Sequence, residues 1–201
     1  MATVYAHTND GYVARFNQSS WSNARANTAG TTVSSTGTSN TVSISASRQA
    51  ARGGGYSFHI YRSFLFFDTS GISGDVSEAT LKIRGAGFAT GDVIAVKSNS
   101  DIDNQGNVTF YSAEISTWST SGYNDITLNS TALANMRDDD KVYICLLNAD
   151  YDLRDVAPTG YATHRNGLYY TNYTGTSRDP YIDYTLAPTT TDNSVFFGCN
   201  F

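Results

Sequence analysis

The sequence feature that most constrains the fold of this chain is a two-residue alternation of apolar and polar side chains. Its clearest instance is residues 79–84, where Ala79, Leu81 and Ile83 alternate with threonine, lysine and arginine. Successive side chains of a strand point to opposite faces, so this pattern is typical of a sheet with one buried and one solvated face. Helical periodicity is almost absent from the chain. The recurring alternation therefore predicts an all-β protein.

Further segments of this kind bring the expected total to about ten short strands. They span residues 3–7, 11–15, 41–45, 56–67, 79–84, 92–97, 124–128, 141–147, 163–171 and 180–186. One short helix is expected at residues 130–136, with Asn129 or Ser130 as its N-cap. Most of the remainder of residues 17–47 is interpreted as a long surface loop.

This spacing of strands and turns is typical of a sandwich or barrel. A chain of 201 residues also suits one substantial core. We therefore expect an antiparallel β-sandwich over residues 1–186, followed by a linker and an apolar tail over residues 187–201.

The strongest strand signal, residues 56–67, contains one conflict. Its apolar residues on one face are Tyr56, Phe58, Ile60, Phe64 and Phe66. Arg62 falls on the same face, so it is either a paired, partly buried cation or the sign of a bulge near Ser63 that resets the register. We favour the bulge, or a break into two strands, because single strands of this length are uncommon.

Composition and charge exclude two classes of partner. Only 15% of the residues are charged, and the formal net charge is −5. Lysine and arginine are scattered rather than clustered, which argues against nucleic acid as a partner. No stretch is long and apolar enough to cross a membrane, and residues 1–7 lack the basic and apolar regions of a signal peptide. We expect neither nucleic-acid nor membrane partners.

The residues that usually carry chemistry do not form a recognisable site. His7, His59 and His164 are not spaced as metal ligands, and no nucleophile-elbow, phosphate-loop or dinucleotide motif is present. Cys145 lies in an expected buried strand and is interpreted as a core residue, while a disulfide to Cys199 has no support. We expect no catalytic residues, no metal site and no cofactor.

Residues 101–106 raise one alternative, since oxygen-bearing side chains at alternate positions before a glycine can wrap Ca²⁺. An EF-hand loop would need glutamate at its twelfth position, which here is Ser112. A polar loop is the favoured interpretation, and a structural Ca²⁺ elsewhere in the sandwich stays open.

Two sets of residues are candidates for binding rather than catalysis. The C-terminal segment is apolar and aromatic, and we expect Val195, Phe196, Phe197 and Phe201 to dock on another protein or on a second copy of this chain. Sugar binding uses aromatic faces beside polar groups. The candidate glycan contacts are Trp21, Trp118 and Tyr123.

Four motifs, taken in order, resemble a known family. They are residues 10–13 (DGYV), 61–72 (YRSFLFFDTSGI), 76–83 (VSEATLKI) and 175–185 (GTSRDPYIDYT). Together they resemble the jelly-roll domains of tailed-bacteriophage virion structural proteins. They are also loosely similar to the carbohydrate-binding-like, DNRLRE-type domains of bacterial surface proteins. The resemblance covers residues 3–186 and implies jelly-roll topology and a place in a virion or on a surface, without implying a catalytic residue set.

The expectation from sequence is a non-enzymatic virion structural protein of a tailed phage, either a capsid decoration protein or a head-fibre component. It would be made in the host cytoplasm and would assemble with other virion proteins, and with copies of itself, through the C-terminal tail. The alternative is a carbohydrate-binding module or adhesin that recognises host or cell-surface glycans.

Overall fold

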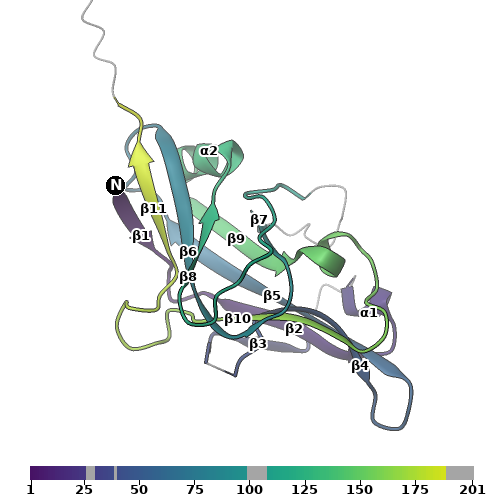
Figure 1. Ribbon diagram of the computed structural model, residues 1–201. Helices are drawn as coiled ribbons and strands as arrows, with labels where there is room; N and C mark the ends of the chain where they lie inside the picture. The colour runs from purple at the N-terminus through teal and green to yellow at the C-terminus, as the bar shows by residue number, and fades with distance from the viewer. Residues whose placement is uncertain (26–29, 39, 99–107, 189–201) are drawn as a thin grey trace, which may run out of the picture.

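The computed structural model describes residues 1–25, 30–38, 40–98 and 108–188, and it confirms the expected all-β sandwich (Figure 1). The strands are β1 (Ala2–Tyr5), β2 (Gly11–Gln18), β3 (Thr32–Ser34), β4 (Ile44–Ala50), β5 (Tyr56–Asp68), β6 (Val76–Ala89), β7 (Val93–Lys97), β8 (Tyr123–Thr127), β9 (Lys141–Asn148), β10 (Ala162–Leu168) and β11 (Tyr181–Leu186). The helical segments are α1 (Trp21–Arg25), α2 (Ser130–Asp138) and a π-helical turn, η2 (Ala149–Leu153).

All strand pairs are antiparallel, and two long strands connect the layers. The first half of β6 pairs with β11 and β8, and its second half pairs with β10. The first half of β5 pairs with β4 and β2, and its second half pairs with β9, which in turn pairs with β7. Figure 1 shows that the sheet of β10, β4, β5 and β2 extends past the layer formed by β1, β11 and β6. One face of that extension is therefore not covered by the opposing layer.

The main core lies between these layers, where β6 faces the second half of β5 and β9. Ala79, Leu81 and Ile83 are at most 4% exposed, which confirms the inward face that the alternation predicts. Other large members of the core include residues of β5, β8, β9, β11 and α2: Leu65, Phe67, Ile126, Ile144, Leu146, Ile182 and Met136. Helix α2 begins as expected, since the side chain of Asn129 accepts a hydrogen bond from the backbone N–H of Ala132 at 3.1 Å.

The prediction of a bulge or break in residues 56–67 is wrong. Strand β5 runs continuously through 13 residues, and its pairings with β4 and β9 show no shift of register. Arg62 is instead the paired, partly buried cation, and its partner is Asp152. The irregularity lies in the neighbouring strand, where the pairing of β2 with β5 shifts between Arg15 and Gln18.

The face of β5 that enters the main core is not the face that the alternation predicts. Leu65 and Phe67 enter this core, while Phe64, on the opposite face, packs against a second apolar cluster that includes Val96 and Cys145. Both faces of this half of β5 are therefore covered, and apolar side chains point to both of them. The apolar–polar alternation consequently cannot show which face enters the main core.

Several other expectations can be compared directly with the described residues. The interpretation of residues 17–47 as mostly loop missed α1 and β3. Cys145 is fully buried, which confirms it as a core residue, and burial raises the pKa of its thiol to about 12.

Within the described segments, no helix is long and apolar enough to span a membrane. The expected docking residues Val195, Phe196, Phe197 and Phe201, together with Cys199 and residues 101–106, lie outside the described residues.

Candidate functional site

Three surface hollows of the described chain differ in the polar groups that they offer to a ligand. The first, called the sheet hollow, has a volume of about 300 Å³ and lies on the extension of the sheet. Its lining residues are Phe16, Asn17, Val42, Ser45, Ser47, Gln49, His59, Tyr61 and Arg165. Ligand pockets commonly measure about 300–1,000 Å³, so the sheet hollow can hold one small ligand or the terminal unit of a larger one.

Strand register brings the lining of the sheet hollow together from four strands. Arg165 of β10 is opposite Ser45 of β4, and Ser45 is opposite Tyr61 of β5. One pair further along, Ser47 is opposite His59. Residues opposite each other in neighbouring strands point to the same face, so these side chains form one continuous surface.

The register shift in β2 supplies the remaining wall of the hollow. It falls between Arg15 and Gln18, so Phe16 and Asn17 are the residues displaced by the irregularity. Asn17 has a φ angle of 59°, which lies in the left-handed region that asparagine tolerates better than most residues. Bulges redirect side chains, and this one places an aromatic ring and an amide in the hollow.

Many polar groups of the sheet hollow have no partner within the described protein. Gln49, Asn17 and the Tyr61 hydroxyl make no side-chain hydrogen bond to any described residue. Ser45 and Ser47 form the floor of the hollow. Both residues are nearly fully buried, and their hydroxyls lie 2.7 Å apart and hydrogen-bond to each other. The hollow therefore presents free donors and acceptors above a fixed polar floor.

Burial lowers the pKa of His59 below its usual value of 6.5, so its imidazole is neutral at pH 7. Its Nε2 lies 3.0 Å from the hydroxyl of Ser57, which is the distance expected of a nucleophile and its base. Among the described residues, no carboxylate contacts the imidazole to orient it, as a catalytic triad would require. The pair is best explained as a strand histidine that is satisfied by its neighbour.

Arg165 is held by an aromatic ring rather than by a carboxylate. Its guanidinium carbon lies 3.9 Å from the centroid of the Phe88 ring, a distance typical of a cation–π interaction. No ion pair joins Arg165 to any described acidic residue, and no aspartate or glutamate lines the sheet hollow. Its N–H groups therefore remain available to a ligand.

Two of the three aromatic residues expected to contact glycans do lie together. Trp118 and Tyr123 line a second hollow of about 520 Å³, called here the Trp118 hollow, with Asn124 and Asp125. The Trp118 indole N–H donates to the carbonyl of Gly167 at 3.1 Å, and the Tyr123 hydroxyl donates to the carbonyl of Ser177 at 3.1 Å. The polar groups of both aromatic residues thus already hydrogen-bond to backbone carbonyls of the protein.

Two further polar side chains of the Trp118 hollow are also engaged. Asn124 accepts a hydrogen bond from the backbone N–H of Ser119 and donates to the carbonyl of Ile83. Asp125 accepts from Lys82 at 2.6 Å. This hollow offers aromatic faces but few free hydrogen-bonding groups, so it is the weaker candidate for a saccharide site.

Trp21 lies apart from the other two aromatic residues, at the start of α1. Its indole N–H donates to Asp155 at 2.9 Å, and its ring lies edge-on to Phe58 with centroids 6.1 Å apart. Asp155 is also 3.5 Å from Arg25 of the same helix. These contacts give Trp21 a structural role in attaching α1 to the sheet.

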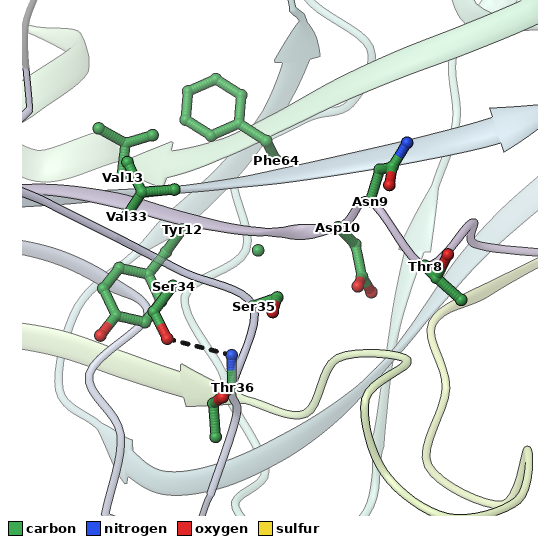
Figure 2. Close-up of a pocket in the computed structure, with 11 residues that line it drawn as sticks. Thr8, Asn9, Asp10, Tyr12, Val13, Val33, Ser34, Ser35, Thr36 and Phe64 are labelled. Atoms are coloured by element: carbon green, nitrogen blue, oxygen red, sulfur yellow. Dashed lines mark hydrogen bonds between the residues drawn. The ribbon is translucent and has the colours of Figure 1, made fainter.

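A third hollow, of about 660 Å³, follows the edge formed by β2 and β3 (Figure 2). Figure 2 shows Phe64 on one side of β2 and the Tyr12 ring on the other, so this surface wraps around an edge. Asp10 is the only acidic residue of its described lining, and both carboxylate oxygens accept hydrogen bonds from Thr171. The carboxylate is therefore already satisfied within the protein.

The sequence predictions missed every residue of the sheet hollow. The one available signal was the alternation of Ser43, Ser45 and Ser47, which resembles a solvated strand face although all three are at most 2% exposed. As for metal ions, the described residues contain no group of three or more histidine, cysteine or acidic side chains arranged to hold one.

The fold and this site define an all-β antiparallel sandwich that carries a ligand-sized polar hollow on an uncovered sheet face. Comparison with protein-family models found no match, and comparison with curated proteins found no significant match. The function must therefore be argued from the site.

Proposed function

We propose that this domain binds a saccharide in the sheet hollow and catalyses no reaction. The observation that carries the proposal is the set of free polar groups from Asn17, Gln49 and Tyr61 beside the ring of Phe16. Saccharides present many hydroxyl groups that both donate and accept, together with apolar C–H faces that pack on aromatic rings. Amide and hydroxyl side chains next to aromatic rings complement both features.

The proposal can be tested on a glycan array with the full chain and three single variants. Gln49→Ala and Tyr61→Phe remove free polar groups of the sheet hollow, whereas Tyr123→Ala removes an aromatic face of the Trp118 hollow. We expect the first two variants to weaken binding about tenfold, the usual effect of one lost hydrogen bond in a site. Weakening by Tyr123→Ala alone would move the site to the Trp118 hollow and contradict the proposal.

For the biological setting, we propose a virion structural protein of a tailed phage, assembled through the tail at residues 188–201. The family resemblance supports this setting. A structural feature also favours an assembling surface, because Val33 on the short strand β3 is 76% exposed beside Val13 and Phe64. Exposed apolar edges are common association sites. Co-purification with intact particles at a fixed copy number would test this setting.

A further inference from the structure

The sheet hollow has an electrostatic character that the protein as a whole does not share. The chain has a formal net charge of −5, yet among the described residues that line the hollow Arg165 is the only one whose side chain is formally charged at pH 7. The other lining residues are neutral amides, hydroxyls, aromatic rings, a valine and the neutral His59. A ligand in the hollow therefore meets a positive charge that no acidic side chain of the described lining offsets.

The arginines of the described chain include two groups: some pair with carboxylates, whereas Arg48, Arg84, Arg165 and Arg178 lie over aromatic rings. Arg62 is paired with Asp152, Arg154 with Glu114, and Arg137 with both Asp75 and Asp138. In each of these cases the guanidinium forms an ion pair with a carboxylate of the protein. Of the ring-supported arginines, Arg165 lines the ligand-sized sheet hollow, and it has no carboxylate partner among the described residues.

The backbone and ring around Arg165 hold it in position. The backbone N–H of Arg165 donates to the hydroxyl of Thr90 at 3.1 Å, and the backbone carbonyl of Arg165 accepts from the backbone N–H of Thr90 at 2.9 Å. The Phe88 ring lies against the guanidinium, 3.9 Å from ring centroid to guanidinium carbon. No described residue accepts a hydrogen bond from the guanidinium N–H groups, so they can make paired hydrogen bonds with an oxyanion.

We infer that the sheet hollow selects acidic saccharides, whose carboxylate or sulfate group pairs with the guanidinium of Arg165. This inference rests on the proposed saccharide binding and adds the ligand class. Neutral polar residues around the cation recognise the sugar hydroxyls, while Arg165 distinguishes an acidic sugar from its neutral counterpart. Charge-assisted hydrogen bonds are roughly twice as strong as neutral ones, so loss of the acid should weaken binding about tenfold or more.

The test uses pairs of probes that differ in charge. One pair is trigalacturonate and its methyl ester, and two others are sialyllactose with lactose and sulfated with unsulfated galactan oligomers. Each is titrated into the full chain, into Arg165→Gln and into Arg165→Lys. Arg178→Gln is the matched control, since Arg178 also lies over aromatic rings, 4.7 Å from Tyr169 and 4.1 Å from Tyr173, but does not line the hollow.

We expect at least one acidic probe to bind the full chain ten times more tightly than its neutral partner. Arg165→Gln should abolish this preference, Arg165→Lys should retain part of it, and Arg178→Gln should leave it unchanged. Equal binding of acidic and neutral probes in the hollow, or a preference that survives Arg165→Gln, would overturn the inference while leaving saccharide binding intact. If no probe on these pairs or on the glycan array binds, both proposals fail.

Discussion

Arg62 and Asp152 form a two-pronged ion pair in the interior of the protein. Nε of Arg62 lies 2.8 Å from Oδ2 of Asp152, and Nη2 lies 2.8 Å from Oδ1. Asp152 is 1% exposed, and Arg25 of α1 donates to its backbone carbonyl at 2.8 Å. The pair therefore joins β5 and α1 to the π-helical turn η2, and it explains how a cation is accommodated in the middle of the longest apolar strand signal.

The first prediction concerns this ion pair. Asp152→Ala would remove the buried carboxylate that Arg62 and Arg25 share, and breaking a buried pair in this way typically costs about 3–5 kcal/mol. The free energy of unfolding, measured by urea denaturation, should fall by that amount. Asp125→Ala is the control because Asp125 is 58% exposed, and loss of its pair with Lys82 should cost at most about 1 kcal/mol. Equal losses in the two variants would contradict the structural role assigned to Asp152.

A second prediction concerns Asp10, whose pKa is raised, mainly by burial. A raised pKa means that the carboxyl contributes most to stability below its unfolded value near 3.8, and that this contribution is lost as pH rises through the folded value. Asp10→Asn should therefore be at least as stable as the wild type at pH 7, since an amide can still bond to both groups of Thr171. This advantage should shrink as the pH falls toward 3.8.

Asp10→Ala is the contrasting variant. It leaves the N–H and hydroxyl of Thr171 without their acceptor, which should cost about 1–3 kcal/mol at pH 7. Urea denaturation of the three proteins across pH 4 to 7 provides the comparison. An asparagine variant as unstable as the alanine variant would show that the charge of Asp10, rather than its hydrogen bonds, supports the loop.

A third prediction concerns the polar boundary of the main core. The hydroxyl of Tyr170 is fully buried and lies 2.7 Å from that of Ser63, which donates in turn to the carbonyl of Ser43 at 2.8 Å. Tyr170→Phe should lower the free energy of unfolding by about 1–2 kcal/mol, because it removes a buried hydrogen bond. Tyr161→Phe, at a ring that is 73% exposed, is the control and should change stability by less than about 0.5 kcal/mol.

The fourth prediction tests the proposed assembly role of the tail. Strand β11 ends at Leu186, and deletion of residues 188–201 removes no described strand. The truncated protein should keep its cooperative unfolding transition but should no longer associate with particles or with other copies. Decoration of particles at full occupancy by the truncated protein would refute the docking role of Phe196, Phe197 and Phe201.

Local patterns predicted several elements because their physical causes are local. The inward face of residues 79–84 follows from the two-residue period of a strand with one solvated side. The start of α2 follows from the capping preference of Asn129. By contrast, the core face of β5 could not be predicted, since apolar packing on both sides removes the asymmetry on which the alternation depends.

The candidate site could be predicted only in part. Two of the aromatic residues chosen from the sequence, Trp118 and Tyr123, do share a hollow, but their polar groups bond within the protein. The sheet hollow combines residues that are up to 149 positions apart, from Phe16 to Arg165, and antiparallel register alone makes them neighbours. No feature of any one segment indicates that its neighbours will leave this face uncovered.

The sequence by itself determined the class of fold and the positions of most strands, since both depend on side-chain periodicity and turn residues close together in the chain. Tertiary structure alone decided which arginine is neutralised by a carboxylate and which is left facing a hollow. Arg62 meets Asp152 because η2 folds back onto β5, whereas Arg165 lies over Phe88 in the lining of the sheet hollow. The fate of each charge depends on what the rest of the chain brings within a few ångströms of it.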